Sequence, residues 1–157
     1  MKPKRVIQIS LTSVLIGYAI TLLWRSQDVR VLWLRVTKFC PGCDLQGVQL
    51  LGVNLSGANL QAADLQFANL SEANLHKVNL SEARLGHSNL SLANLSQANL
   101  QAADLGNSDL SGASLTGANL QRANLQAVRL WLADLDGARL DGAILHEALL
   151  DGATGIP

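Results

Sequence analysis

Aromatic residues are scarce in this sequence: Phe, Trp and Tyr make up 4% of its 157 residues, although 48% of the residues are hydrophobic. A globular domain of this length normally builds its core from a mixture of aliphatic and aromatic side chains. The scarcity excludes such a mixed core, so Leu and Ala must fill the interior.

The short motifs that carry common enzyme chemistry are also absent. The sequence contains no G-x-S-x-G nucleophile elbow, no Walker loop, no G-x-G-x-x-G fingerprint and no H-E-x-x-H motif. We therefore expect no enzymatic activity, no catalytic residues, and no bound cofactor or metal ion.

Neither sign of charge predominates over the whole chain, but the charges are unevenly distributed. Residues 1–39 contain seven Lys or Arg and one acidic residue, a net charge of +6. Residues 40–157 contain five Lys or Arg and eleven Asp or Glu, a net charge of −6. The chain is therefore expected to have a basic N-terminal part and an acidic body.

Charged residues are absent from residues 6–24, VIQISLTSVLIGYAITLLW. A helix of this length spans about 28 Å, the thickness of a bilayer core. We therefore predict a transmembrane helix at 6–24, after a basic tail at 1–5, and a single-pass membrane protein; a cleaved secretory signal is the alternative. The side of the membrane that carries the rest of the chain stays undecided, because Lys and Arg flank the span on both sides.

A short amphipathic helix is predicted within residues 25–42, which link the span to the rest of the chain. Its apolar residues recur at the spacing of one helix face: Val29, Leu32, Trp33 and Val36. Two interpretations stay open. In the first, this face caps the first coil of the following domain. In the second, it lies on anionic lipid beside the membrane span, for which Trp33 and the nearby Arg and Lys residues are suitable; the two are compatible.

Leu occupies every fifth position from Leu45 to Leu150, which gives 22 repeats in one register. Two positions before each Leu lies a small or β-branched residue, most often Ala. Neither a helix nor a straight strand keeps these Leu side chains on one face, because five residues turn a helix by about 500° and an odd spacing alternates the faces of a strand. A chain that bends once per repeat keeps them inside, which predicts a solenoid.

The repeats AADLQ, EANLH, QANLQ and GANLQ resemble the A(D/N)LXX consensus of the pentapeptide repeat family. The resemblance covers residues 43–153 and implies an all-β solenoid, a right-handed quadrilateral β-helix with four repeats in each coil. Carried over, the 22 repeats make about 5.5 coils, and a spacing of ~4.8 Å per coil gives a tower ~26 Å tall. Residues 154–157 are then a short C-terminal tail.

The repeated residues are expected to serve the architecture. By this resemblance, Leu and the small residue before it point inward. Asn or Asp just before most Leu suits a tight turn, because its side chain can bond nearby backbone groups. Gly after the Leu relaxes the corner of the coil.

Only two cysteines are present, Cys40 and Cys43 in FCPGCDL. A zinc site normally needs four ligands, and a thioredoxin-like redox pair needs a βαβ unit, so neither is expected. The remaining interpretations are a cap, with Cys43 as the first inward small residue, and a disulfide that clamps this cap in an oxidising compartment. Several pentapeptide repeat proteins of photosynthetic bacteria begin with a similar CxxCDL segment, and this resemblance implies a cap.

Outward positions are mostly polar, and the exceptions are candidate contact residues. Leu92 and Leu132 occupy equivalent positions two coils apart, and Trp131 precedes Leu132. These three residues are the predicted partner-binding patch. The other exceptions are Leu51, Phe67, Ile144 and Leu149.

Two functions are expected from these features. The first is a non-enzymatic, membrane-anchored scaffolding module that binds an unidentified protein partner and no nucleic acid. The alternative follows from the resemblance, because certain pentapeptide repeat proteins mimic duplex DNA and act on DNA gyrase, and the acidic body fits this role modestly. A homodimer through the C-terminal coil is a further prediction, since little sequence follows Leu150 to cover the unpaired edge.

Overall fold

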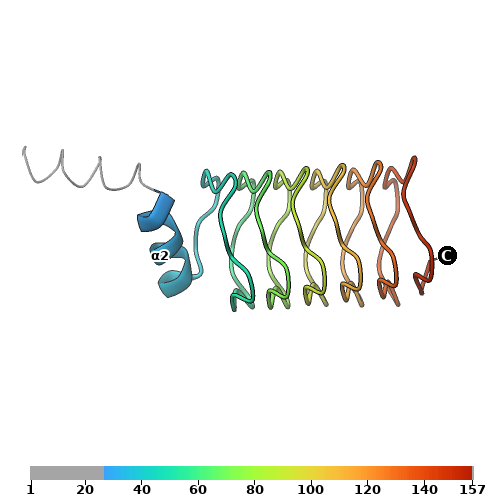
Figure 1. Ribbon diagram of the computed structural model, residues 1–157, viewed down its shortest axis with the longest axis horizontal. Coiled ribbons are helices and arrows are strands. Elements are labelled where there is room, and N and C mark those ends of the chain that lie inside the picture. The colour runs from blue at the N-terminus through green and yellow to red at the C-terminus, as the bar shows by residue number, and fades with distance from the viewer. Residues whose placement is uncertain (1–26, 157) are drawn as a thin grey trace, which may run out of the picture.

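The computed structural model describes residues 27–156, which form one helix followed by a solenoid (Figure 1). The helix, α2, comprises Gln27–Thr37 and lies across the end of the solenoid that contains its first coil. Within residues 27–156, no helix is long and apolar enough to cross a membrane. The predicted basic tail at 1–5 and the predicted transmembrane helix at 6–24 lie outside the described residues.

A type II turn follows every Leu of the repeat and bends the chain once per five residues. The second residue after each Leu has a positive φ of 52–72°, and the third donates its N–H to the Leu carbonyl at 2.8–3.3 Å. Glycine adopts this left-handed φ without strain, yet fourteen of the 22 positions hold other residues. The hydrogen bonds between coils must therefore help to hold these turns.

Successive coils pair through a parallel ladder. Every fifth residue from Phe39 to Asp134 bridges to the residue 20 positions later, and all but Phe39 stand just before a Leu. One coil therefore contains four repeats and four corners, which confirms the predicted solenoid; its right hand stays a prediction. The pairing consists of single-residue bridges, because a turn in every repeat leaves no room for longer strands.

The ladder is longer than the repeat boundaries predicted at 43 and 153. Phe39 is its first residue, and Cys40 donates its N–H to the Asn59 carbonyl at 2.9 Å, as each Leu does in later coils. At the other end, Thr154 pairs with Asp134 although it lies in the predicted tail. The Leu period missed both because Cys40 and Gly155 stand where a Leu is expected.

The core is a stack of Leu side chains. Every repeat Leu from Leu45 to Leu130 is fully buried, and the small residues two positions earlier lie mostly buried beside them. Burial of one Leu side chain contributes about 1.5–3 kcal/mol before the entropy cost. Ser88 and Ser108 replace Ala in this core, and each hydroxyl donates to the carbonyl of the Leu three residues earlier at 2.6 Å, so neither is left unsatisfied.

Asn and Asp just before Leu hold the turns as predicted. Their side-chain oxygens accept a hydrogen bond from the backbone N–H two residues later, as Asn54 does from Ser56 at 3.1 Å. On one side of the tower, Asn59, Asn79, Asn99 and Asn119 also hydrogen-bond to one another from coil to coil. The same side chains therefore fix both the turn and the stacking of coils.

Helix α2 caps the first coil, but through a different face from the predicted one. Leu34 is fully buried and Val31 packs against the core, whereas the predicted packing residues Leu32, Trp33 and Val36 are exposed. The rotation of the helix is fixed where it ends. Lys38 adopts a φ of 54° and donates its N–H to the Leu34 carbonyl at 2.8 Å, and the chain then enters the ladder at once. This connection turns Leu34 inward.

The C-terminal end has no comparable cover among the described residues. Leu140, Leu145 and Leu150 of the last coil are only partly buried. Their N–H groups have no backbone partner within residues 27–156, because the acceptors would belong to a further coil. This end is therefore an open parallel edge over a partly exposed apolar core, and a homodimer through it stays a prediction.

Leu95→Ala in the middle of the tower should lower the free energy of unfolding by about 2–5 kcal/mol, since it leaves a cavity in a closed stack. Leu150→Ala in the open last coil should cost less, because its side chain is already partly exposed. Urea unfolding followed by far-ultraviolet circular dichroism measures both. Equal losses would contradict the difference in packing between the two positions.

Candidate interaction surface

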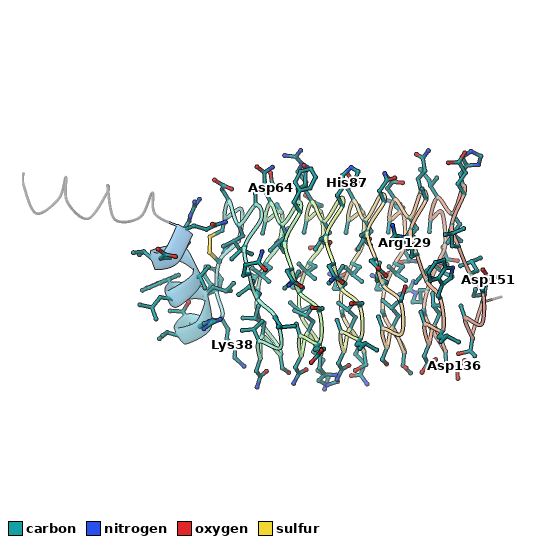
Figure 2. The ribbon with its side chains drawn as sticks, viewed as in Figure 1. Lys38, Asp64, His87, Arg129, Asp136 and Asp151 are labelled. Atoms are coloured by element: carbon teal, nitrogen blue, oxygen red, sulfur yellow. A yellow bond between two sulfur atoms is a disulfide. The ribbon has the colours of Figure 1, made fainter. Side chains whose placement is uncertain are left out.

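The CxxC segment forms the turn that joins α2 to the first complete repeat. Cys40 and Cys43 are joined by a disulfide, with their Cα atoms 5.5 Å apart. Cys40 occupies a Leu position and is 2% exposed, and Cys43 occupies a small-residue position and packs against the core. Gly42 has the positive φ of 65° that this turn requires. The segment is thus a repeat turn closed covalently, and Figure 2 shows the yellow sulfur atoms between α2 and the first coil.

An ion pair and backbone contacts hold α2 on this end. Arg30 Nη1 lies 3.1 Å from Asp44 Oδ2, and the Arg30 side chain is only 18% exposed. Lys38, at the lower edge of the solenoid in Figure 2, donates from Nζ to the Ser56 carbonyl at 3.0 Å. Polar contacts therefore complete a cap whose apolar contact is small.

The Asp44 carboxyl is shifted towards its ionised form. The backbone N–H of Gln46, which donates to Oδ1 at 3.3 Å, and then the Arg30 guanidinium hold the pKa of Asp44 below its ordinary value of 3.8. The adjacent side of the tower repeats this chemistry: burial raises the pKa of Asp109, but hydrogen bonds from Ser111 and Arg129 outweigh it and lower the pKa overall. Both shifts belong to structural contacts.

The predicted patch lies along one corner of the tower. Leu92 and Leu132 are the second turn residues of equivalent repeats two coils apart, and Trp131 is the first turn residue beside Leu132. Their exposed fractions are 64%, 75% and 44%. The structure therefore places the three residues on one corner; their role in binding stays a prediction.

Two glycines on this corner explain how the leucines lie. A Cβ added at Gly112 would meet Leu92 Cδ2 at 2.8 Å, and one added at Gly152 would meet Leu132 Cδ2 at 2.7 Å. Each Leu side chain is therefore laid over the glycine of the next coil. Leu and Gly alternate along this part of the corner, so an apolar ridge extends over four coils.

The other exposed apolar residues do not join this ridge as one cluster. Phe67 lies on another corner, where its ring stacks on His87 with centroids 5.2 Å apart. Leu51 shares the column of Trp131 but lies four coils away. Ile144 and Leu149 are face residues of the open last coil.

A second apolar surface is the predicted face of α2, which is exposed and does not form the cap. The name outer face of α2 is used here for three residues of the helix and one just after it: Leu32, Trp33, Val36 and Phe39. Their side chains are 44–75% exposed. The period of the helix identified three of these residues correctly as one face, but the sequence did not show which side met the solenoid. The outer face therefore points to solvent or to a partner.

The histidines and acidic residues of the described part of the chain do not show the grouping that a metal site needs. Within residues 27–156, no three His, Cys, Asp or Glu side chains are grouped so that they could hold a metal ion. His76 instead hydrogen-bonds through Nδ1 to Ser96 Oγ at 2.9 Å, and His87 stacks on Phe67.

Acid should loosen the cap. Asp44 is stabilised as a carboxylate only in the folded chain, so its contribution is complete above the unfolded pKa near 3.8 and is lost as the pH falls through the lower folded pKa. Asp44→Asn should lower stability at about pH 7 by less than about 1 kcal/mol, because the Asp44 side chain is largely exposed, and its difference from the wild type should shrink as the pH is lowered to about 2.5. Urea unfolding at both pH values measures this.

Asp151→Asn is the matched control, since Asp151 has no ion pair among the described residues. It should leave stability at about pH 7 unchanged. A difference between Asp44→Asn and the wild type that persists at low pH would contradict the ionic contribution.

Comparisons with known proteins agree with this architecture. A family model described as pentapeptide repeats matches residues 41–77, 79–117, 93–131 and 118–154. The crystal structure of the pentapeptide repeat protein Rfr23 from the cyanobacterium Cyanothece 51142 is 30% identical, covers 82% of this chain and 98% of its own, and superposes with a TM-score of 0.63. A comparison with curated protein sequences gave no match.

Two further solved structures align over most of the solenoid. HetL, a pentapeptide repeat protein involved in heterocyst differentiation regulation in Nostoc sp. strain PCC 7120, is 36% identical over 73% of this chain and 62% of its own, with a TM-score of 0.45. A pentapeptide repeat protein of the Arabidopsis thaliana thylakoid lumen is 31% identical over 71% of this chain and 69% of its own, with a TM-score of 0.47.

Proposed function

The chain belongs to the pentapeptide repeat family, and we propose that it is a non-enzymatic, membrane-anchored interaction module. In this proposal the solenoid is a stiff post that presents a contact surface to a protein partner. Residues 6–24 hold the post in a membrane.

The observation that carries the protein-binding part is the apolar ridge on an otherwise polar tower. Leu92 and Leu132 have φ values of 59° and 57°, where Gly or Asn is less strained than a bulky side chain. Their side chains stay largely exposed although they cover the next glycine. The turn gains little from Leu at these positions, so binding is the better reason for the ridge, with Trp131 as its aromatic anchor.

The membrane part rests on the sequence and on the outer face of α2. The uncharged stretch at 6–24 is long enough to span a bilayer core. Directly after it, α2 exposes Leu32, Trp33 and Val36, and Arg35 is exposed on the same helix. A helix that presents both apolar and basic side chains suits the interface of an anionic membrane.

The double variant Trp131→Asp with Leu92→Asp should abolish partner capture, because two carboxylates would have to be desolvated at the centre of the contact. A photoreactive group at Ser111, which lies in the same column as Trp131, should trap the partner in native membranes of the source cell. The crosslinked adduct is expected with the wild type and is expected to be lost, by about tenfold or more, with the double variant.

Leu51→Asp is the control, because Leu51 is 60% exposed in the same column of the corner but lies four coils from Trp131. It should leave capture unchanged. Capture that survives the double variant, or that Leu51→Asp abolishes equally, would remove the support for this patch.

Membrane attachment predicts that the full chain stays with vesicles after extraction in alkaline carbonate. Leu15→Lys places a charge at the middle of residues 6–24, at a cost of about 2.5–3.5 kcal/mol for a helix spanning the bilayer, and should increase the released fraction. Gln61→Lys adds the same charge to the exposed turn of a repeat and should change nothing. Complete release of the wild-type chain would refute the anchor.

DNA mimicry is the alternative function, and the net charge of −6 over residues 40–157 supports it. Two of these carboxylates are paired across coils, Asp64 with Arg84 at 2.9 Å and Asp109 with Arg129 at 3.2 Å. The acidic surface is therefore partly neutralised, which favours the protein-binding proposal. Supercoiling by DNA gyrase that is unchanged by this protein would exclude the alternative.

A further inference from the structure

Two glycines interrupt a column of longer side chains on the corner that also carries Phe67 and His87. The first turn residues of this column are Gln46, Gln66, Gly86, Gly106, Gln126 and His146. Neither Gly86 nor Gly106 has a positive φ. The turn conformation therefore does not require glycine at either position.

Packing does not require glycine at position 86 either. A Cβ added there would have only two neighbours within 4 Å, the Gly106 carbonyl oxygen at 3.6 Å and Asp104 Oδ2 at 4.0 Å, which are ordinary van der Waals contacts. At position 106 the space is tighter, because a Cβ would lie 3.2 Å from Asn124 Nδ2 and 3.3 Å from Asp104 Oδ1. The bare backbone thus leaves open a space that the fold could fill at position 86.

The space is a hollow of about 200 Å³, named here the glycine hollow. Polar side chains surround the two glycines: Gln66, His87, Asp104, Asn107, Asn124 and Gln126. Its volume is below the ~300–1,000 Å³ of sites for free small molecules. A hollow of this size suits a single side chain or functional group.

Asp104 supplies a fixed carboxylate at this site. Its Oδ1 accepts hydrogen bonds from the Gly106 N–H at 3.1 Å and from Asn124 Nδ2 at 2.8 Å. Its Oδ2 accepts no hydrogen bond from residues 27–156. This oxygen is the side-chain atom nearest to where a Cβ at Gly86 would lie. One carboxylate oxygen is therefore oriented by the fold and left available to a donor.

The cation closest in the column is directed away from Asp104. Arg84 lies one coil before Asp104, and its Nη1 contacts Asp64 Oδ2 at 2.9 Å. The Gln66 side-chain amide, oriented with its oxygen towards Arg84, accepts a hydrogen bond from Arg84 Nε at 2.8 Å. Asp104 itself forms no ion pair within the described residues. The negative charge of the hollow is thus not neutralised by the described part of the chain.

We propose that the glycine hollow binds the guanidinium group of an arginine side chain presented by a protein partner. A guanidinium carries five N–H donors in one plane, which suits the free Asp104 oxygen and the amide oxygens around it. Guanidinium groups also stack on flat rings, and the His87 ring, held against Phe67 at an interplanar angle of 5°, borders the hollow. This inference rests on the proposed protein-binding function and adds a contact at the corner next to the Leu92 ridge.

The test is a titration of the full-length chain, labelled with ¹⁵N-glycine in detergent micelles, with the peptide acetyl-Gly-Arg-Gly-amide. The amide signals of Gly86 and Gly106 should move saturably at concentrations up to about 10 mM, which covers a Kd near 1 mM. The same peptide with citrulline, a neutral analogue of arginine, should bind at least about tenfold more weakly, since charge-assisted hydrogen bonds are lost. A lysine peptide should also bind more weakly.

Two variants change the hollow in different ways. Gly86→Gln installs the side chain that positions 66 and 126 of the same column carry, and Asp104→Asn removes the charge at nearly constant shape. Each should weaken arginine binding by about tenfold or more, with unchanged thermal unfolding. Ser81→Gln, in the same coil at the preceding corner, adds a side chain outside the hollow and should leave binding unchanged.

Several results would overturn the inference. Equal shifts with the arginine and citrulline peptides, equal binding of lysine, or full binding by folded Gly86→Gln would each do so, as would the absence of saturable shifts. Trp131→Asp with Leu92→Asp should not affect the peptide titration. Loss of partner capture at the ridge therefore tests the proposed function, and loss of peptide binding tests the hollow alone.

Discussion

The structure depends on one constraint. Every inward Leu must be followed by a turn whose backbone N–H can donate a hydrogen bond to a carbonyl of the next coil. The turn places a left-handed residue at each corner, and most of these residues are not glycine. The strain is tolerated because the N–H of the left-handed residue itself is paired with the next coil, as Phe67 N–H is with the Gly86 carbonyl at 3.1 Å. Turn and ladder therefore stabilise each other, and neither is expected to persist alone.

The same dependence makes the two ends of the tower differ. At the N-terminal end, Leu34 covers the Leu stack, and Arg30, Lys38 and the disulfide tie the cap to the first coil. At the C-terminal end no described residue covers the last coil. Its turns carry four carboxylates, at Asp136, Asp141, Glu147 and Asp151. A second copy placed against this end would bring two acidic rims together, so its apolar contact would have to outweigh repulsion.

The sequence predicted the solenoid correctly because the period of five is uninterrupted and no helix or strand satisfies it. For the cap it predicted the wrong face of α2, because the helix period fits Leu32, Trp33 and Val36 as readily as it fits Val31 and Leu34. The interpretation in which the predicted face lies on lipid stays a prediction. The face that forms the cap is decided by the tertiary connection, in which Phe39 enters the ladder directly after the helix and Leu34 is buried against the first coil. The disulfide stood among the alternatives for Cys40 and Cys43, and the sequence also placed Cys43 in the small-residue column, but the place of Cys40 in the Leu column followed only from the ladder.

Features that distinguish this tower from a bare repeat appear at the coil period of 20 residues. Leu92 and Gly112 are 20 positions apart, and the larger side chain fills the space that the glycine leaves. Gly86 and Gly106 are also 20 positions apart, and since both lack a side chain, nothing fills the space between Gln66 and Gln126. One combination produces a ridge and the other a hollow from the same fold. A single repeat does not show whether its corner is raised or hollow. That depends on which residue stands 20 positions away, in the same column of the next coil.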